Sequence, residues 1–329
     1  MSLTKFTSLK TALNLLSLIR EGMLTSLWSI KVFTSNSMIS APPHEYHLDK
    51  PTLQASDVKD VPAEFVADPF IIVHENKYYM FFEVLNKASG RGEIGLAISN
   101  DGEEWMYEKI VMNEKHHLSY PQVFKFKDEI YMLPETEQTQ GVLLYKATNF
   151  PFEWEIACKL FSGRYVDPSI FEFDNKWWIF AGSEGKNLHL FHSDSLEGPW
   201  VEHPQSPIIT NNSSISRPGG RIIVQNGEIY RYTQDGKDYY GKATRVFKII
   251  KLTDSEYEEE EAELILSGTN RDNDWRRDGM HHIDQVKIQD GQWLVAVDGH
   301  RFRKINYFFW KLDRMFSKIQ LKIREALSL

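Results

Sequence analysis

The chain has 329 residues, of which 42% are hydrophobic and 13% aromatic, and it carries a formal net charge of −8. The first 35 residues carry +3 and residues 301–329 carry +6, which leaves −17 for residues 36–300. This acidic body argues against a nucleic-acid partner, because phosphate backbones are bound by basic surfaces. The single cysteine, Cys158, excludes a disulfide framework and a thiolate metal site, and agrees with a reducing, cytoplasmic location.

The N-terminal segment, residues 1–25, has an amphipathic pattern that predicts a helical extension. Polar residues interrupt it too often for a membrane-spanning helix. We expect no signal peptide, because a clean apolar stretch followed by a small-residue cleavage site is missing.

A unit of about fifty residues recurs from Asp68 onward. Its copies open on Asp68-Pro69, Tyr120-Pro121, Asp167-Pro168 and Arg217-Pro218, which are 52, 47 and 50 residues apart. Each copy contains short apolar or aromatic runs of strand length separated by polar turns. A repeat of this length made of short strands indicates the blades of a β-propeller.

Four strands are expected in each of the first four copies. The expected ranges are 70–73, 78–83, 93–99 and 105–112; 123–125, 130–135, 142–147 and 154–161; 169–173, 177–181, 188–192 and a strand from Trp200; and 221–224, 229–233, 244–252 and 263–266. Their apolar alternation is imperfect, as is usual where both faces of a strand are buried. The acidic run 254–263 is expected to be a solvated loop.

A fifth copy is incomplete, with strands expected at 281–288 and 292–297 and its outer two strands missing. A propeller ring closes to remove exposed strand edges. We therefore expect the N-terminal segment to supply the missing strands, with residues 27–33 as the leading candidate. The fold class is predicted as all-β, a five-bladed propeller over residues 26–300 with amphipathic helical extensions at both ends.

The C-terminal segment, residues 301–329, predicts a basic amphipathic helix. Its apolar residues recur at helical spacing between lysines and arginines: Phe308, Leu312, Met315, Phe316, Ile319, Ile323 and Leu327. Such a helix can lie among the headgroups of an anionic bilayer. The equally weighted alternative is a helix packed on the outside of the propeller or against a partner chain.

Propeller geometry places a candidate site at the mouth of the central channel. The first strand of each blade begins there and the second strand returns there, so residues distant in sequence are expected to converge on one pocket. The converging set is Asp68, Glu83, Tyr120, Glu135, Asp167, Arg217, Gln234, Asp235, His281, His282 and Asp298.

These residue types fit carbohydrate chemistry. Glycoside cleavage or transfer uses one carboxylate to stabilise or attack an oxocarbenium-like centre and a second acid to protonate the leaving oxygen. Close carboxylates separate their pKa values and thereby take different roles. Tyr120, Tyr232 and Tyr240 could stack on sugar rings. For a single Asp-Pro a capped turn is the simpler interpretation, but two at equivalent positions favour a site.

Six motifs in order resemble a known propeller family. They are Phe65-Val66-Ala67-Asp68-Pro69-Phe70, His117-Leu118-Ser119-Tyr120-Pro121, Tyr131-Met132-Leu133-Pro134-Glu135, Val166-Asp167-Pro168-Ser169, Ser216-Arg217-Pro218-Gly219-Gly220-Arg221 and His281-His282-Ile283-Asp284. They resemble the N-terminal propeller domain of plant glucosamine inositolphosphorylceramide transferases and of bacterial proteins associated with surface polysaccharide genes. The resemblance covers residues 60–300 and extends, more distantly, to glycoside hydrolase family 43.

The wider resemblance implies roles for three carboxylates. It implies Asp68 as base or nucleophile, Asp167 as the residue that orients substrate and tunes the acid, and a glutamate as general acid. Where the hydrolases offer that glutamate, this chain has Arg217-Pro218-Gly219-Gly220-Arg221. Glu135, from another blade, is the candidate to replace that general acid. The departure from the hydrolase pattern disfavours ordinary glycoside hydrolysis.

The two arginines suggest a phosphate cradle. Guanidinium groups bind phosphate oxygens bidentately, and Gly219 and Gly220 would permit close approach of the backbone. This arrangement favours glycosyl transfer or phosphorolysis. The alternative is that Arg217 and Arg221 pair with Asp167 or Glu135 and neutralise buried carboxylates.

No cofactor or metal site is predicted, although a cation on the channel axis is an open alternative. His281 and His282 are adjacent on a strand and point to opposite faces, so they do not easily share one ion. The predicted substrate is a sugar, phosphosugar or glycan, with Glu83, Tyr120, Arg217, Arg221, Gln234, Tyr240, His281, His282 and Asp298 as binding residues. We expect a carbohydrate-active enzyme of surface glycan or glycolipid assembly, cytoplasmic and peripheral at the inner membrane face. The alternatives are a furanosidase-like hydrolase and a non-catalytic glycan-binding propeller with a partner transferase.

Overall fold

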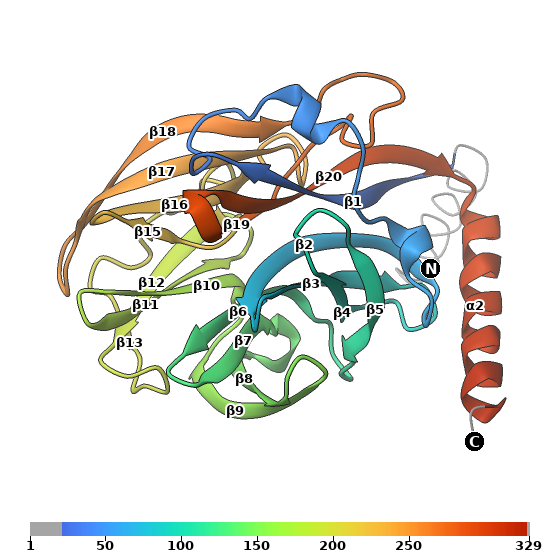
Figure 1. The fold of residues 1–329 in the computed structure, drawn as a ribbon, viewed down its shortest axis with the longest axis horizontal. Helices are drawn as coiled ribbons and strands as arrows, with labels where there is room; N and C mark the ends of the chain where they lie inside the picture. The colour runs from blue at the N-terminus through green and yellow to red at the C-terminus, as the bar shows by residue number, and fades with distance from the viewer. Residues whose placement is uncertain (1–21, 328–329) are drawn as a thin grey trace, which may run out of the picture.

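The computed structural model describes residues 22–327 as a ring of five β-sheets with one long helix outside it (Figure 1). Four sheets have their main strands in chain order from the axis outward, as in propeller blades. The predicted all-β, five-bladed propeller is therefore confirmed.

The blades follow the repeat copies. Blade 1 contains β2 (Ala63–His74), β3 (Lys77–Asn86), β4 (Arg91–Ser99) and β5 (Met106–Met112); blade 2 contains β6 (Ser119–Phe126), β7 (Glu129–Glu135), β8 (Gly141–Asn149) and β9 (Glu153–Ser162). Blade 3 contains β10 (Val166–Phe173), β11 (Lys176–Ser183), β12 (Asn187–Ser193) and the short β13 (Val201–Glu202). Blade 4 contains β14 (Arg217–Pro218), β15 (Ile223–Gln225), β16 (Glu228–Asp235), β17 (Ala243–Leu252) and β18 (Tyr257–Ser267). Short 3₁₀ helices lie at Glu45–Leu48, Ala55–Asp57, Glu137–Thr139 and Gln289–Gly291.

The fifth blade is closed by the N-terminal strand. β1 (Met23–Ser35) pairs antiparallel with β20 (Trp293–Ile305), which pairs with β19 (Ile283–Lys287). The expected closure is thus found, but β1 supplies one strand rather than two. Among residues 22–327, an isolated bridge between Ile30 and Leu53 is what marks the place of a fourth strand. β1 and β20 also reach past both limits of the predicted range 26–300.

In blades 1 to 3 the residue before the repeated proline occupies a β-bulge. The ladders shift register between Ala67 and Phe70, between Ser119 and Gln122, and between Val166 and Ser169. At these bulges Asp68, Tyr120 and Asp167 have φ values of 52°, 50° and 48°, in the left-handed region that non-glycine residues rarely adopt. The bulge explains the repeated motif, because it re-aims one side chain of each first strand near the axis.

The acidic run 254–263 is mostly a strand, so its assignment to a loop was wrong. β18 begins at Tyr257, and its glutamates lie opposite basic residues of the neighbouring strand β17: Lys248 faces Glu260 and Lys251 faces Glu258. Glu259 also forms a salt bridge of 2.7 Å with the buried Arg231 of β16. Cross-strand charge pairing stabilises this outer strand despite its unusual composition.

The core lies between neighbouring blades rather than within one layer. Ile30 and Val32 of β1 pack with Leu294 of β20 against Val66 and Phe82 of blade 1. These contacts join the first and last parts of the chain, so the ring is sealed by apolar packing as well as by strand pairing.

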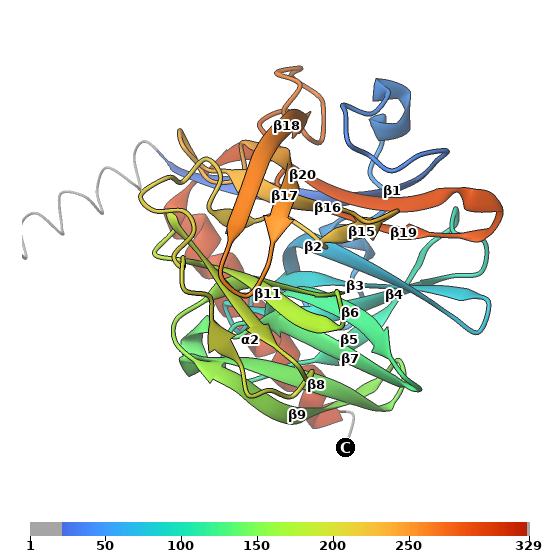
Figure 2. The same cartoon turned by 90° about the vertical axis from the view of Figure 1, so that its left-hand side faces the viewer.

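The C-terminal helix α2 (Tyr307–Leu327) confirms the predicted helix and runs along blade 1 on the outside of the ring (Figures 1 and 2). Trp310 and Arg314 hydrogen-bond the two carboxylate oxygens of Glu64, at 2.8 and 2.9 Å, and Asp313 pairs with Lys87. Its opposite face exposes Phe308, Phe309, Met315, Phe316, Ile319, Ile323 and Leu327. Within residues 22–327 no helix is long and apolar enough to cross a membrane. The amphipathic helix expected for residues 1–25 lies outside the described residues, except that β1 already begins at Met23.

Candidate active site

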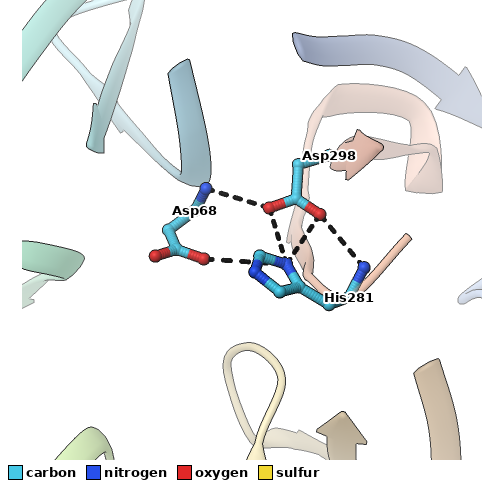
Figure 3. Close-up of side chains that lie close together, drawn as sticks. All are labelled: Asp68, His281 and Asp298. Carbon is cyan, nitrogen blue, oxygen red and sulfur yellow. Dashed lines mark hydrogen bonds and ion pairs between the residues drawn. The ribbon is translucent and has the colours of Figure 1, made fainter. Parts of the chain in front are cut away.

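The mouth of the channel gathers an ionisable cluster from all five blades. Asp298 of β20 organises one side of it (Figure 3). Its Oδ1 accepts hydrogen bonds from the backbone N–H groups of His281 and His282, at 3.1 and 3.0 Å, and its Oδ2 accepts one from the backbone N–H of Asp68 at 3.1 Å. Asp298 therefore fixes the backbone of blades 1 and 5 beside each other.

The His281 ring lies between two partners. Its Nδ1 is 2.9 Å from Asp298, and its Nε2 is 2.9 Å from the hydroxyl of Tyr240. Asp68, His281 and Asp298 also place one potential ligand atom each within 4.8 Å of one another, so they are the described residues that could hold a cation. Because both nitrogens of His281 are already hydrogen bonded, an ion there would have to break one of these bonds.

Asp167 is held by blade 4. The Nε of Arg217 donates to its Oδ2 at 2.5 Å and the second guanidinium nitrogen donates to its Oδ1 at 3.3 Å, while Gln234 donates to Oδ2 at 2.7 Å. The same guanidinium reaches Glu135 at 3.5 Å. Arg217 thus neutralises buried carboxylates. This is the arrangement that the sequence analysis gave as the alternative to a phosphate cradle.

The carboxyl groups of this cluster have separated pKa values. Burial and the neighbouring Asp167 raise the pKa of Glu135, which shares a hydrogen bond with that aspartate. Burial opposes ionisation of Asp167, but Arg217 and the Glu135 hydrogen bond outweigh it and lower the Asp167 pKa. The pKa values of Glu135 and Asp167 are thus shifted in opposite directions, which suits an acid and a base in one site.

Asp68 behaves differently from what the wider resemblance implied. Burial raises its pKa well above the ordinary value, and the negative charges of Asp167 and Asp298 raise it further. Its Oδ1 has no hydrogen-bond partner and lies 3.8 Å from Nδ1 of His282, which is also unpartnered. This raised pKa disfavours the ionised form of Asp68 that the role of a base needs.

Glu83 forms the edge of the cluster with His117. Burial and Asp167 raise the pKa of Glu83 to about 8. The backbone N–H of Gly92 donates to Nδ1 of His117 at 2.9 Å, which leaves the proton of the neutral ring on Nε2, 3.4 Å from Glu83. His117 therefore presents an N–H group to this carboxyl.

Two residues predicted at the mouth, Tyr120 and His282, lie buried within the channel wall instead. Phe70, Tyr120 and His282 contact one another with ring centroids 4.7 to 5.2 Å apart and form a buried aromatic plug. The Tyr120 hydroxyl bonds Ser169 and Gly220, and His282 Nε2 bonds the carbonyl of Pro69. Stacking of a sugar on Tyr120 is therefore excluded, as it is on the buried Tyr232, whose hydroxyl bonds the carbonyl of Ile39.

Arg221 lies beyond that plug, and its placement in a phosphate cradle was wrong. Its guanidinium stands over the Phe70 ring, binds Asp284 at 2.7 Å and donates to the carbonyls of Ile71 and Val123. Gly220 has a related structural role, because a β-carbon there would lie 1.7 Å from the carbonyl oxygen of Ile283. The glycines allow blade 4 to approach blade 5, rather than a ligand.

The mouth thus brings together most of the predicted set. Asp68, Glu83, Glu135, Asp167, Arg217, Gln234, Tyr240, His281 and Asp298 lie in one network, with Tyr240 half exposed and 5.1 Å from the Arg217 guanidinium. Asp235 is paired with Arg245 at 2.8 Å.

Sequence reasoning missed two members of the site. His117 stands in one of the six motifs but had no assigned role. Trp28 of β1 stacks on His281 with ring centroids 4.0 Å apart, and no repeat pattern could indicate this contact because β1 precedes the first copy.

The sequence profile of one family, "Glucosamine inositolphosphorylceramide transferase 1, N-terminal", matches residues 25–300. The chain belongs to this family. It is 38% identical over 250 residues to the rice (Oryza sativa subsp. japonica) protein named glucosamine inositolphosphorylceramide transferase 1, covering 73% of this chain and 34% of that one. It is 33% identical over 297 residues to the Arabidopsis thaliana protein of the same name, covering 83% and 39%. This member of the family spans little more than a third of the length of these curated relatives.

Solved structures support the propeller fold of the family member. An exo-1,5-alpha-L-arabinanase from a bovine ruminal metagenomic library aligns with a TM-score of 0.53 at 17% identity, covering 74% of this chain and 94% of that one. The GH62 alpha-L-arabinofuranosidase catalytic domain of Coprinopsis cinerea aligns with a TM-score of 0.54 at 10% identity, covering 83% and 96%. At these identities the likeness establishes the fold alone.

Proposed function

We propose that this propeller is a carbohydrate-active enzyme of surface glycan or glycolipid assembly that transfers a glycosyl group at its central cluster. The observation that carries the proposal is the buried pair of Glu135 and Asp167, which both contact Arg217 and whose pKa values are shifted in opposite directions. Glu135 ends the second strand of blade 2 and Asp167 lies in the first strand of blade 3, so the fold brings them together. The half-exposed Tyr240 lies at the same mouth. The names of the curated relatives and the arabinanase-like fold agree with a sugar substrate.

The cluster provides the parts of an acid–base mechanism. Glu135 holds the proton that a leaving oxygen requires, and Asp167 provides a fixed negative charge for an oxocarbenium-like centre. Arg217 and Gln234 hold Asp167 in position by hydrogen bonds. Arg217 is a quarter exposed, so one edge of its guanidinium remains able to meet the phosphate of an activated sugar donor.

The test is a turnover assay with matched variants. Purified protein is incubated with a panel of nucleotide sugars and phospholipid vesicles, and separately with nitrophenyl glycosides, and products are identified by mass spectrometry. We expect glycolipid product from wild type, and a loss of about 10²-fold or more in Glu135→Gln and Asp167→Asn. Glu228→Gln, which removes a carboxylate from an ion pair with Lys248 on the surface, is the control and keeps full turnover.

The outcomes separate the candidate functions. Cleavage of nitrophenyl glycosides that depends on Glu135, without any transfer product, would establish the hydrolase alternative. Absence of turnover on both panels, with glycan binding unaffected by Asp167→Asn, would establish a binding module. That second candidate is favoured by one observation, namely that the chain corresponds to little more than a third of relatives named as transferases.

We further propose that the protein is cytoplasmic and peripheral at the inner membrane face, with α2 as the contact. The exposed face of α2 is apolar and lies opposite the face that packs on Glu64, and Lys311, Lys318 and Lys322 flank it. This distribution suits the headgroup region of an anionic bilayer. Phe316→Glu with Ile319→Glu should abolish co-sedimentation with anionic vesicles while leaving the melting temperature unchanged; retained binding would contradict the proposal.

A further inference from the structure

A groove of about 910 Å³ lies beside the central cluster, not over it. Its walls come from the β1–β20 ribbon, the beginning of α2 and the start of β2. Figure 1 shows the ribbon of β1 and β20 leading directly to the top of α2. The groove therefore sits where the two basic ends of the chain meet the propeller.

The groove and the central site adjoin the same β1–β20 ribbon, and Trp28 borders both of them. Leu27 pairs with Arg301 and Thr25 with Arg303, so these side chains share a face, and all four residues line the groove. The next pair along the ribbon, Trp28 and His300, has the other orientation, and there Trp28 stacks on His281. A ligand in the groove is thus held one strand pair away from the catalytic cluster.

Some charged side chains of the groove form ion pairs and others do not. Lys87 pairs with Asp313 at 3.0 Å, and Glu64 pairs with Arg314 at 2.9 Å. Arg301, Arg303 and Lys304 have no ion pair or side-chain hydrogen bond to any residue between 22 and 327. Three cations without an ion-pair partner among residues 22–327 lie in this groove, beside a propeller whose residues 36–300 carry −17, and they point to an anionic ligand.

The groove is continuous with the apolar face of α2. Phe309 lines the groove and is 68% exposed, and it is followed along the helix by the exposed Phe316 and Ile319. A ligand that suits both features has an anionic head for the arginines and an apolar body for Phe309. A phospholipid has both an anionic head and an apolar body.

We propose that this groove is a headgroup site for an anionic phospholipid, in which Arg301 and Arg303 bind the phosphate ester, assisted by Lys304. Guanidinium groups bind phosphate oxygens in a forked geometry that an ammonium group does not provide. The inference rests on the membrane contact proposed above. A soluble phosphosugar carries the same phosphate ester and is the competing source of ligand.

The test compares two double variants of equal charge. Arg301→Gln/Arg303→Gln removes the arginines of the groove, and Lys318→Gln/Lys322→Gln removes two exposed charges from α2 away from it. Binding is measured by flotation with phosphatidylcholine vesicles that contain or lack phosphatidic acid, and by calorimetry with glucose 1-phosphate. Lys304→Gln is the second groove variant if the arginine pair fails to fold.

We expect wild type to prefer vesicles with phosphatidic acid, the arginine variant to lose roughly 100-fold in affinity, and the lysine variant to lose roughly tenfold or less. Equal losses in both variants would overturn the site, because they would indicate general charge attraction. Glucose 1-phosphate binding that depends on the arginines, without vesicle preference, would overturn the lipid source. Wild-type binding to vesicles with and without phosphatidic acid alike would overturn the headgroup site and leave the contact through α2 standing.

Discussion

The indole of Trp28 stacks on the imidazole of His281, with ring centroids 4.0 Å apart and planes inclined by 24°. Trp28 belongs to β1, the strand that closes the ring, while His281 lies just before β19 and bonds Asp298 in the central cluster. Gly241 packs against the same indole, since a β-carbon there would lie 2.3 Å from it. Trp28 therefore takes part both in closing the propeller and in building the site.

Replacement of Trp28 by alanine should destabilise the protein by about 3–5 kcal/mol, because it removes a large buried side chain and leaves a cavity. Urea unfolding monitored by circular dichroism measures the change. Trp28→Phe keeps an aromatic ring against His281 and should cost less than half as much. A loss below about 1 kcal/mol in the alanine variant would show that β1 pairing closes the ring without this contact.

The repeat made the fold and the convergence of the site predictable. Propeller geometry fixes where first strands begin and second strands end, so Asp68, Asp167 and Glu135 could be placed at one mouth from sequence spacing alone. The edge left by an incomplete fifth copy likewise required a closing strand, which β1 supplies.

The depth at which each side chain lies along the central channel could not be predicted from the sequence. One residue along a strand decides whether a side chain faces the mouth, as His281 does, or the plug, as His282 does. Arg221 follows a glycine pair that turns the chain toward blade 5, and no spacing rule reports that turn. The end of β18 was predicted as a strand at 263–266, but its beginning was assigned to a loop, because the cross-strand partners of its glutamates on β17 cannot be read from the acidic run alone.

The pair of Asp167 and Arg217 provides a second prediction. Arg217→Met should destabilise the protein by about 3 kcal/mol, since it leaves Asp167 buried without its counter-ion. The double variant Asp167→Asn/Arg217→Met should recover part of this loss, because no unpaired charge remains. Chemical unfolding of the two single variants and the double variant measures the coupling. Strictly additive losses would indicate that the two side chains do not stabilise each other.

The raised pKa of Glu83 predicts a loss of stability at alkaline pH. Its pKa rises from 4.5 to about 8 on folding, so its favourable contribution is complete below 4.5 and is lost as the pH rises through about 8. Between about pH 7 and about pH 9 wild type should lose about 1 kcal/mol more than Glu83→Gln. Urea unfolding at both pH values measures this difference. Glu228→Gln, whose exposed carboxyl has a lowered pKa, is the control and should follow wild type. Parallel curves for wild type and Glu83→Gln would refute the assignment.

Arg221 provides the prediction that separates structure from ligand binding. Its guanidinium joins blade 4 to the carbonyls of Ile71 in blade 1 and Val123 in blade 2, and to Asp284 of blade 5, whose Oδ2 also accepts the Ile71 N–H at 2.7 Å. Arg221→Met should therefore cost about 3–5 kcal/mol, because the fully buried Asp284 is left without its partner.

Arg221→Lys should fall between wild type and the methionine variant, since an ammonium group keeps the charge but not the three-way contact. Below the unfolding transition, both variants should bind phosphate and phosphosugars at the mouth as wild type does, because the plug of Phe70, Tyr120 and His282 separates Arg221 from that site. Unfolding curves and calorimetric titrations of the same preparations measure the two effects. Unchanged stability together with lost phosphate binding would instead place Arg221 in the cradle that the sequence first indicated.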